Sequence, residues 1–152
     1  MRIHHPALKF WLPPLIWMVL IFSASADAAS VHHSSRLFEP FMRWLFPHLA
    51  QSRIDEIHYV IRKCAHMAEF GLLALLLWQA IRHTYHPAVR RWHWPHAGLA
   101  LAIVLLYAVS DEIHQIFISG RNGQISDVVI DTVGGAAGLG FVWLIGRVFK
   151  RW

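Results

Sequence analysis

The sequence predicts an all-α membrane protein: a polytopic four-helix bundle with one additional amphipathic interfacial helix in its first outer loop. Two observations lead to this fold class. The chain of 152 residues is 56% hydrophobic and only 15% charged, whereas about a quarter of the residues of a soluble domain are charged. The apolar residues also gather in four long segments. The length suits one domain, so we expect residues 1–152 to form a single membrane domain.

Four apolar segments have the length of a membrane span, at residues 10–26, 59–81, 97–118 and 125–149. A helix of about 22 residues rises roughly 33 Å, which matches a hydrocarbon core about 30 Å thick. The first segment follows Lys9 and ends in small residues, which is also the pattern of a signal peptide. We interpret it as a retained helix because three further spans follow. In the fourth span, we expect Gly134 and Gly138 to serve helix packing.

The outer loop after the first span contains one further predicted helix, at residues 34–49. Its apolar residues recur at helical spacing: Leu37, Phe38, Phe41, Leu45 and Phe46. We expect this amphipathic helix to lie in the outer interface of the membrane. A lid that gates access to a substrate is the alternative role for it.

The distribution of charge predicts that both termini are cytoplasmic. With the N-terminus inside, eight Lys and Arg residues fall on the inner side and six on the outer side, in agreement with the positive-inside rule. All nine Asp and Glu residues fall on the outer side or in the outer ends of the spans. We therefore expect a multi-pass protein of the bacterial cytoplasmic (inner) membrane.

Charge and cysteine content exclude several other classes of protein. The net charge of +5 comes from basic residues that are scattered at the ends of the apolar segments and form no continuous stripe. We therefore expect them to contact anionic membrane lipids and not nucleic acid. Cys64 is the only cysteine, which excludes a disulfide framework and a zinc-finger spacing. The sequence leaves the oligomeric state open.

Polar residues recur near the outer ends of the second, third and fourth predicted spans. On the second span, Arg62, His66 and Glu69 fall within an arc of about 60° when successive residues turn by about 100°. The second and fourth spans begin outside and the third ends outside, so the polar residues of all three share one depth. We expect them to form a cleft at the outer face.

The residue types in this cluster indicate mixed chemistry. His66 can act as a general acid or base, and Glu69 can orient it; the candidate catalytic residues are His66, Glu69, Asp111, Glu112 and Gln115. Guanidinium and ammonium groups bind phosphate, which makes three residues candidates for anion binding: Arg62, Lys63 and Arg121. Two further carboxylates can join a divalent-cation site or an ion-pair network, Asp127 and Asp131. No particular metal or other cofactor is implied.

A structural interpretation of the same cluster is a network of ion pairs that ties the helix ends together. It would pair Arg62 or Lys63 with Glu69, and Arg121 with Asp127. Ion pairs alone would not require a histidine and a glutamine, and the five acids of the cluster outnumber its three bases. This imbalance favours a functional cleft.

The same residues resemble the motifs of the VanZ-like family. Residues 62–70 read Arg-Lys-Cys-Ala-His-Met-Ala-Glu-Phe and residues 110–115 read Ser-Asp-Glu-Ile-His-Gln, which are similar to the family's K-x-x-H-x-x-x-[YF] and D-E-x-x-Q. The resemblance begins in Phe-Ser-Ala-Ser at residues 22–25 and continues in Gly120-Arg121, Ser126-Asp127, Asp131 and Gly134. Phe70 stands where the family frequently has tyrosine.

The resemblance implies a four-helix integral membrane protein whose first helix is retained. The family is named for a protein associated with low-level resistance to teicoplanin, which implies a link to the cell envelope and to glycopeptide antibiotics. Because the cluster of basic and acidic residues lies at headgroup depth, we expect the outer cleft to recognise an anionic lipid-linked component of the envelope. The alternatives are an intramembrane hydrolase or transferase that acts on a lipid phosphate, and a structural helix-bundle scaffold.

Overall fold

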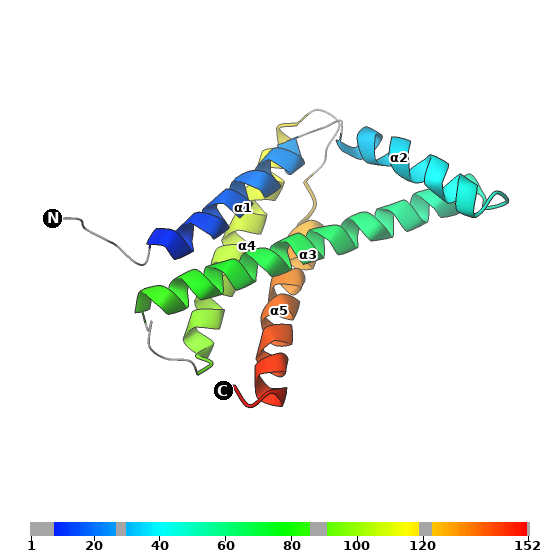
Figure 1. Cartoon of the computed structure of the whole chain (residues 1–152). Helices are drawn as coiled ribbons and strands as arrows, with labels where there is room; N and C mark the ends of the chain where they lie inside the picture. The colour runs from blue at the N-terminus through cyan, green and yellow to red at the C-terminus, as the bar shows by residue number, and fades with distance from the viewer. Residues whose placement is uncertain (1–7, 27–29, 86–90, 119–122, 152) are drawn as a thin grey trace.

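The computed structural model describes residues 8–26, 30–85, 91–118 and 123–151. Within these ranges the chain is helical and contains no strand (Figure 1). The described residues form five helices: α1 (Leu8–Ala26), α2 (Ser30–Leu45), α3 (Gln51–Tyr85), α4 (Trp94–Ile116) and α5 (Ile125–Val148). The all-α class is therefore confirmed for this part of the chain.

Three of these helices are long and apolar enough to cross a membrane, namely α3, α4 and α5. They correspond to the second, third and fourth predicted spans, and α4 and α5 begin and end within three residues of their predicted positions. The apolar part of α1, Lys9–Ser25, is shorter, so a fourth span and the bundle that needs it stay predictions. α1 nevertheless belongs to the folded core, since Ile21 is buried in one cluster with residues of α3, α4 and α5.

α3 is longer than predicted, because it begins at Gln51 and not at residue 59. The polar segment before the span continues the same helix, since it contains no proline or glycine. Its side chains also pair along the helix surface: Gln51 donates a hydrogen bond to Asp55 at 3.0 Å, and Arg53 pairs with Glu56 at 2.7 Å. The 35 residues of α3 rise about 52 Å, which exceeds a hydrocarbon core of about 30 Å.

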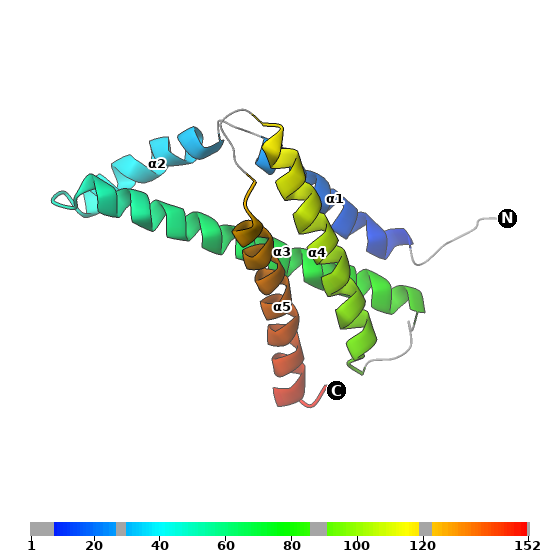
Figure 2. The same ribbon diagram turned by 180° about the vertical axis from the view of Figure 1, so that it is seen from behind.

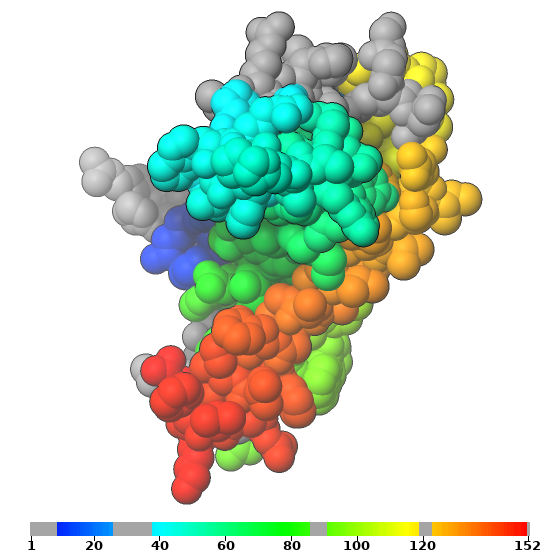
Figure 3. Space-filling view, turned by 90° about the vertical axis from the view of Figure 1, so that its right-hand side faces the viewer, coloured from blue at the N-terminus to red at the C-terminus, as the bar shows by residue number. Residues whose placement is uncertain are grey.

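α2 lies four residues earlier in the chain than the predicted helix at 34–49. Pro47 explains the earlier end, because the residue before a proline is sterically disfavoured in the helical conformation. Met42 of α2 is buried, and Phe38 stacks on His58 of α3 with ring centroids 4.9 Å apart. α2 and the first turns of α3 thus form a helical hairpin that projects from the other helices (Figure 1), and Figure 3 views this hairpin end-on. Its placement in a membrane interface stays a prediction.

α3 crosses α4 and α5 obliquely instead of running alongside them, as the views from opposite sides show (Figures 1 and 2). At the crossing with α5, Gly71 lies against Gly134 and Gly138. A Cβ atom at Gly134 would overlap the backbone of Met67, and one at Gly138 would lie 2.8 Å from the carbonyl oxygen of Gly71. The two backbones can approach this closely because the glycines have no side chain.

Candidate functional site

The predicted polar residues of α3 and α5 face one another where α1 and α4 finish and α5 begins, which we call the polar end. Lys63 Nζ forms an ion pair with Asp127 Oδ1. One turn farther along both helices, His66 Nδ1 lies 3.8 Å from Asp131 Oδ1. Because residues three or four apart share a helix face, the two pairs form successive rungs between α3 and α5. The next contact along α5 is the glycine crossing, which holds the helices close enough for these rungs.

Asp111 joins the end of α1 to α4. Its side chain is 0% exposed, and its Oδ2 accepts hydrogen bonds from Ser25 Oγ and from Gln115 Nε2, both at 2.9 Å. Gln115 follows Asp111 by one helical turn, so the pair shares a face as predicted. Ser25 comes from the last turn of α1 and makes this network a contact between two helices.

Asp111 and Asp131 each keep one buried oxygen, Oδ1, that has no hydrogen-bond partner among the described residues. Asp131 is 1% exposed. Burying an ionised carboxylate oxygen without a donor is costly in an apolar surrounding. Each Oδ1 can therefore accept a hydrogen bond from an incoming donor, and at Asp131 the imidazole Nδ1 of His66 lies 3.8 Å from that oxygen.

Glu112 fastens the connection between α4 and α5. Its Oε2 accepts a hydrogen bond from the backbone N–H of Gln124 at 2.7 Å, immediately before α5 begins. A Cβ atom at Gly123 would lie 2.7 Å from the backbone oxygen of Glu112, so the connection runs directly against the end of α4. Glu112, predicted as a catalytic candidate, thus holds the start of α5, the helix that carries Asp127 and Asp131, against the end of α4.

Asp131 is a carboxylate that lies beside His66, and the sequence did not single it out for this role. Glu69, predicted to orient His66, is half-buried on the same helix, and its backbone carbonyl accepts a hydrogen bond from Trp17 Nε1 at 3.0 Å. The structural interpretation paired Arg62 or Lys63 with Glu69, and Lys63 pairs with Asp127. This pairing results from the tertiary structure, because the crossing of α3 and α5 brings the face of α5 that carries Asp127 over Lys63.

The three candidate anion-binding residues differ in exposure and in whether the structure describes them. Lys63 is partly accessible, with 21% of its side chain exposed, and lies over the ring of Tyr59 at 5.3 Å. Arg62 is half-buried on the neighbouring face of α3. Arg121 lies outside the described residues, and so does the predicted pairing of Arg121 with Asp127. The positive charge that the described structure places at the polar end therefore comes from α3.

The predicted divalent-cation site has no geometric support in the described part of the chain. No group of three or more His, Cys, Asp and Glu side chains lies together there in a way that could hold a metal ion. Asp127 is engaged with Lys63, and Glu112 with a backbone amide. Of the two roles predicted for Asp127 and Asp131, the described contacts fit the network between helices.

Sequence reasoning missed Ser25 as a member of the site. The residue lies in a small-residue string at the end of an apolar helix, which also fits a signal-peptide cleavage region. The only available signal was its place in the Phe-Ser-Ala-Ser string, and that string says nothing about a partner. Asp111 is 86 positions away in the chain, so only the packing of α1 against α4 could identify the contact.

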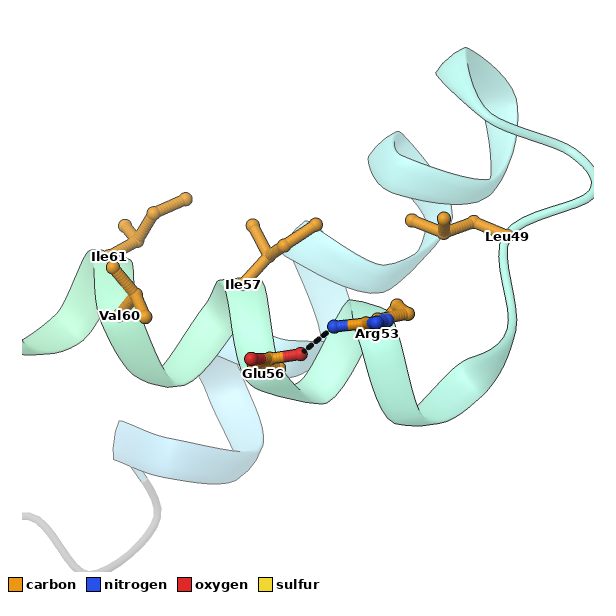
Figure 4. Close-up of a pocket in the computed structure, with 6 residues that line it drawn as sticks. All are labelled: Leu49, Arg53, Glu56, Ile57, Val60 and Ile61. Atoms are coloured by element: carbon orange, nitrogen blue, oxygen red, sulfur yellow. Dashed lines mark hydrogen bonds and ion pairs between the residues drawn. The ribbon is translucent and has the colours of Figure 1, made fainter.

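A pocket of about 430 Å³ lies on the first turns of α3 and the segment that precedes them, and none of the polar-end residues described above lines it (Figure 4). It is open and mainly apolar, and its lining residues are Leu49, Arg53, Glu56, Ile57, Val60 and Ile61. The cleft predicted among the polar residues stays a prediction. The polar cluster and the pocket are separate features of α3.

One comparison with known proteins identifies a relationship. The sequence profile of a protein family described as VanZ/LLP1 matches residues 10–146 of the chain. The matched range includes every residue assigned above to the polar end. No curated protein and no solved structure matches the chain.

Proposed function

Since the chain belongs to the VanZ/LLP1 family, as its motifs predicted, we propose that it is a membrane protein whose polar end binds the phosphate-bearing headgroup of an anionic lipid-linked component of the cell envelope. The observation that carries the proposal is Lys63, a partly accessible cation of α3 that pairs with Asp127 in the first turn of α5. Arg62 precedes it directly, and Arg121 comes four positions before α5 in the sequence.

The chemistry of these residues suits a phosphate. An ammonium group forms charge-assisted hydrogen bonds to phosphate oxygens, and arginine adds a planar fork that binds two of them. A charged group costs about 2.5 kcal/mol or more near the centre of a membrane, so such residues are retained where they have a partner or a ligand. Asp127 offsets this cost for Lys63 and holds its Nζ in one place.

The proposal is tested by lipid-induced thermal stabilisation of the purified protein in detergent. We expect phosphatidic acid, which exposes a phosphate monoester, to raise the Tm more than phosphatidylcholine with the same acyl chains. Lys63→Gln should lose this difference and Lys63→Arg should keep it. Arg43→Gln is the matched control, because it also removes a cation that pairs with a carboxylate, here Glu39 at 3.1 Å. An undiminished phosphatidic acid effect in Lys63→Gln would falsify the proposal.

The contact between His66 and Asp131 favours a second candidate, an intramembrane hydrolase or transferase acting on a lipid phosphate. A carboxylate beside an imidazole fixes the ring and stabilises its protonated form, as a general acid or base requires. The purified protein should then turn over a fluorescent lipid phosphate, and His66→Ala should abolish that turnover while Arg43→Gln retains it. Adding a chelator tests the divalent cation. Equal turnover by the parent protein and His66→Ala rules out this role.

The family is named for a protein associated with resistance to teicoplanin, so the proposal includes an effect on sensitivity to glycopeptides. Cells that lack the protein should change their sensitivity to teicoplanin, and the parent gene and the Arg43→Gln variant should restore it while Lys63→Gln does not.

A structural scaffold, the third hypothesis, predicts a different pattern. Substitutions at the polar end would then lower the folded yield and the cellular effect in parallel, with no variant that is folded yet inactive.

A further inference from the structure

The end of the molecule opposite the polar end carries a row of four tryptophan rings that the proposed function does not use. The ring centroids of Trp78 in α3 and Trp92 lie 4.9 Å apart. Trp94 in α4 continues the row, at 5.6 Å from Trp92 and at 5.6 Å from Trp143 in α5. The row thus connects three helices, and the start of α4 and the end of α5 lie side by side there in both views (Figures 1 and 2).

An arginine lies over the ring at each end of this row. The guanidinium carbon Cζ of Arg82 is 5.4 Å from the ring centroid of Trp78, and that of Arg147 is 5.7 Å from the ring centroid of Trp143. A guanidinium that lies over an aromatic face keeps N–H donors at its edge, where they can bind two oxygens of one phosphate. Arg147 is exposed, and so is Trp94, with an exposed fraction of 63%. The Arg147 end of the row is therefore accessible to a ligand.

The cap of α5 holds two more cations beside Arg147. The backbone N–H of Lys150 donates a hydrogen bond to the carbonyl of Arg147 at 3.2 Å, and that of Arg151 donates one to the carbonyl of Gly146 at 2.8 Å. These two bonds form a Schellman motif. Lys150 occupies its left-handed position with φ 50°, where glycine is the common residue. The motif therefore orders the backbone that carries all three cations.

This end of the molecule has basic residues and no acidic ones. The sequence contains no Asp or Glu in residues 1–26, 70–110 and 132–152, the three stretches that contain this end. Clustered cations at the end of a membrane helix attract the anionic headgroups of the adjoining leaflet. Tryptophan rings are also typical of headgroup depth, because one edge is polar and the rest is apolar. An anionic phospholipid therefore matches the cluster in charge and in depth.

We propose that Arg147, Lys150 and Arg151 bind the phosphate of an anionic phospholipid, and that Trp94 and Trp143 contact its glycerol group and the start of its chains. This is a second lipid site, and it does not depend on the headgroup proposed to bind at Lys63. Asp127, the partner of Lys63, and Arg147 are 20 residues apart in α5, which corresponds to a rise of roughly 30 Å. That rise matches a hydrocarbon core of about 30 Å, so the two sites serve lipids of opposite leaflets.

Native mass spectrometry of the purified full-length protein in a mild detergent can measure this binding. The probes are phosphatidylglycerol and phosphatidylcholine with the same acyl chains. All variants are built on Lys63→Gln, so that binding at the polar end does not contribute. Phosphatidylglycerol should bind more tightly than phosphatidylcholine. Arg147→Gln should weaken phosphatidylglycerol by about tenfold, the contribution of one hydrogen bond between charged groups, and Arg147→Lys should weaken it less.

Arg91→Gln is the matched control, because it removes an exposed cation of the same end that belongs neither to the tryptophan row nor to the cap of α5. It should change the affinity for phosphatidylglycerol by less than about twofold, as expected for one exposed charge. Equal losses in Arg91→Gln and Arg147→Gln would mean that net charge alone attracts the lipid, and would overturn the site. Equal affinities for the two lipids would also overturn it. Displacement of phosphatidylglycerol by inorganic phosphate would assign the site to a soluble anion and overturn the lipid role. None of these outcomes bears on the proposed function, because Lys63 is absent from every variant.

Discussion

At the scale of single residues, the polar end is organised by carboxylates that contact other helices. Asp111 receives two hydrogen bonds on one oxygen, from α1 and from its own helix. Asp127 and Asp131 both lie against residues of α3. Each of these acids was identified from the sequence, but each has a partner that its own helix could not supply. Their first role is therefore to connect helices, and any ligand must bind to a framework that they hold in place.

Asp111 provides a test at this scale. Asp111→Ala removes the acceptor that Ser25 and Gln115 share, and each buried polar group that loses its partner costs about 1–3 kcal/mol. We expect a clear fall in the Tm of the purified protein. Asp111→Asn retains a carbonyl acceptor at the same place and should fall less. Ser110→Ala, which removes an exposed hydroxyl next in sequence, serves as the control. Equal Tm values for Asp111→Ala and Ser110→Ala would contradict the structural role of Asp111.

At the scale of the elements, the contact between α3 and α5 fixes the geometry of the polar end. The rungs from Lys63 to Asp127 and from His66 to Asp131 lie immediately before the glycine crossing. Small residues at positions four apart are a common packing motif, and the sequence predicted packing for Gly134 and Gly138. The sequence did not identify their partner, which is Gly71 together with the backbone of Met67. Hydropathy indicates that α3 is apolar, but it does not indicate which of its faces lacks bulky side chains and can approach the backbone of α5.

Gly134→Ala tests this contact. The added methyl group would overlap the backbone of Met67, and backbone atoms cannot move aside as a flexible side chain can. We expect a destabilisation of about 1–3 kcal/mol or more, the usual cost of overpacking, together with a loss of phosphatidic acid binding. Gly140→Ala is the matched control on the same helix, since a Cβ atom there meets nothing within 4 Å. Similar Tm values for the two variants would show that α3 and α5 do not approach as described.

At the scale of the whole molecule, charge separates the two ends. The described ends opposite the polar end carry basic residues, among them Lys9, Arg82, Arg91, Arg147 and Lys150, and no described acid. We propose on this basis, and on the positive-inside rule, that both termini are cytoplasmic and that the polar end faces outward from the inner membrane. The ligand would then be recognised in the outer leaflet.

Fusions to the C-terminus measure this orientation. A fluorescent protein that folds only in the cytoplasm should be bright after Trp152, and alkaline phosphatase, which is active only outside, should be inactive there. A fusion placed after Gln51, at the tip of the hairpin, should give the reverse result. Bright fluorescence at the hairpin would invert the orientation and place the polar end at the inner leaflet.

Much of the fold follows from local properties of the chain and was therefore accessible from sequence. Apolar runs locate α3, α4 and α5, and motif spacing identifies the VanZ/LLP1 family. The boundaries were less accurate at the hairpin, where α3 absorbs a polar segment because no proline or glycine interrupts it. Helical continuity there depends on the absence of a helix-breaking residue, and a hydropathy window does not detect that.

The sequence by itself determined the all-α class, the long apolar helices, and the group of polar residues that lies at one end of them. Those features depend on composition and on the 3.6-residue period of a helix, which act within a single segment. Only the tertiary structure decided that Lys63 pairs with Asp127, that His66 lies beside Asp131 and that Ser25 binds Asp111. These pairings depend on the crossing and rotation of separate helices. The glycine contact between α3 and α5 sets the first two, and the packing of α1 against α4 sets the third.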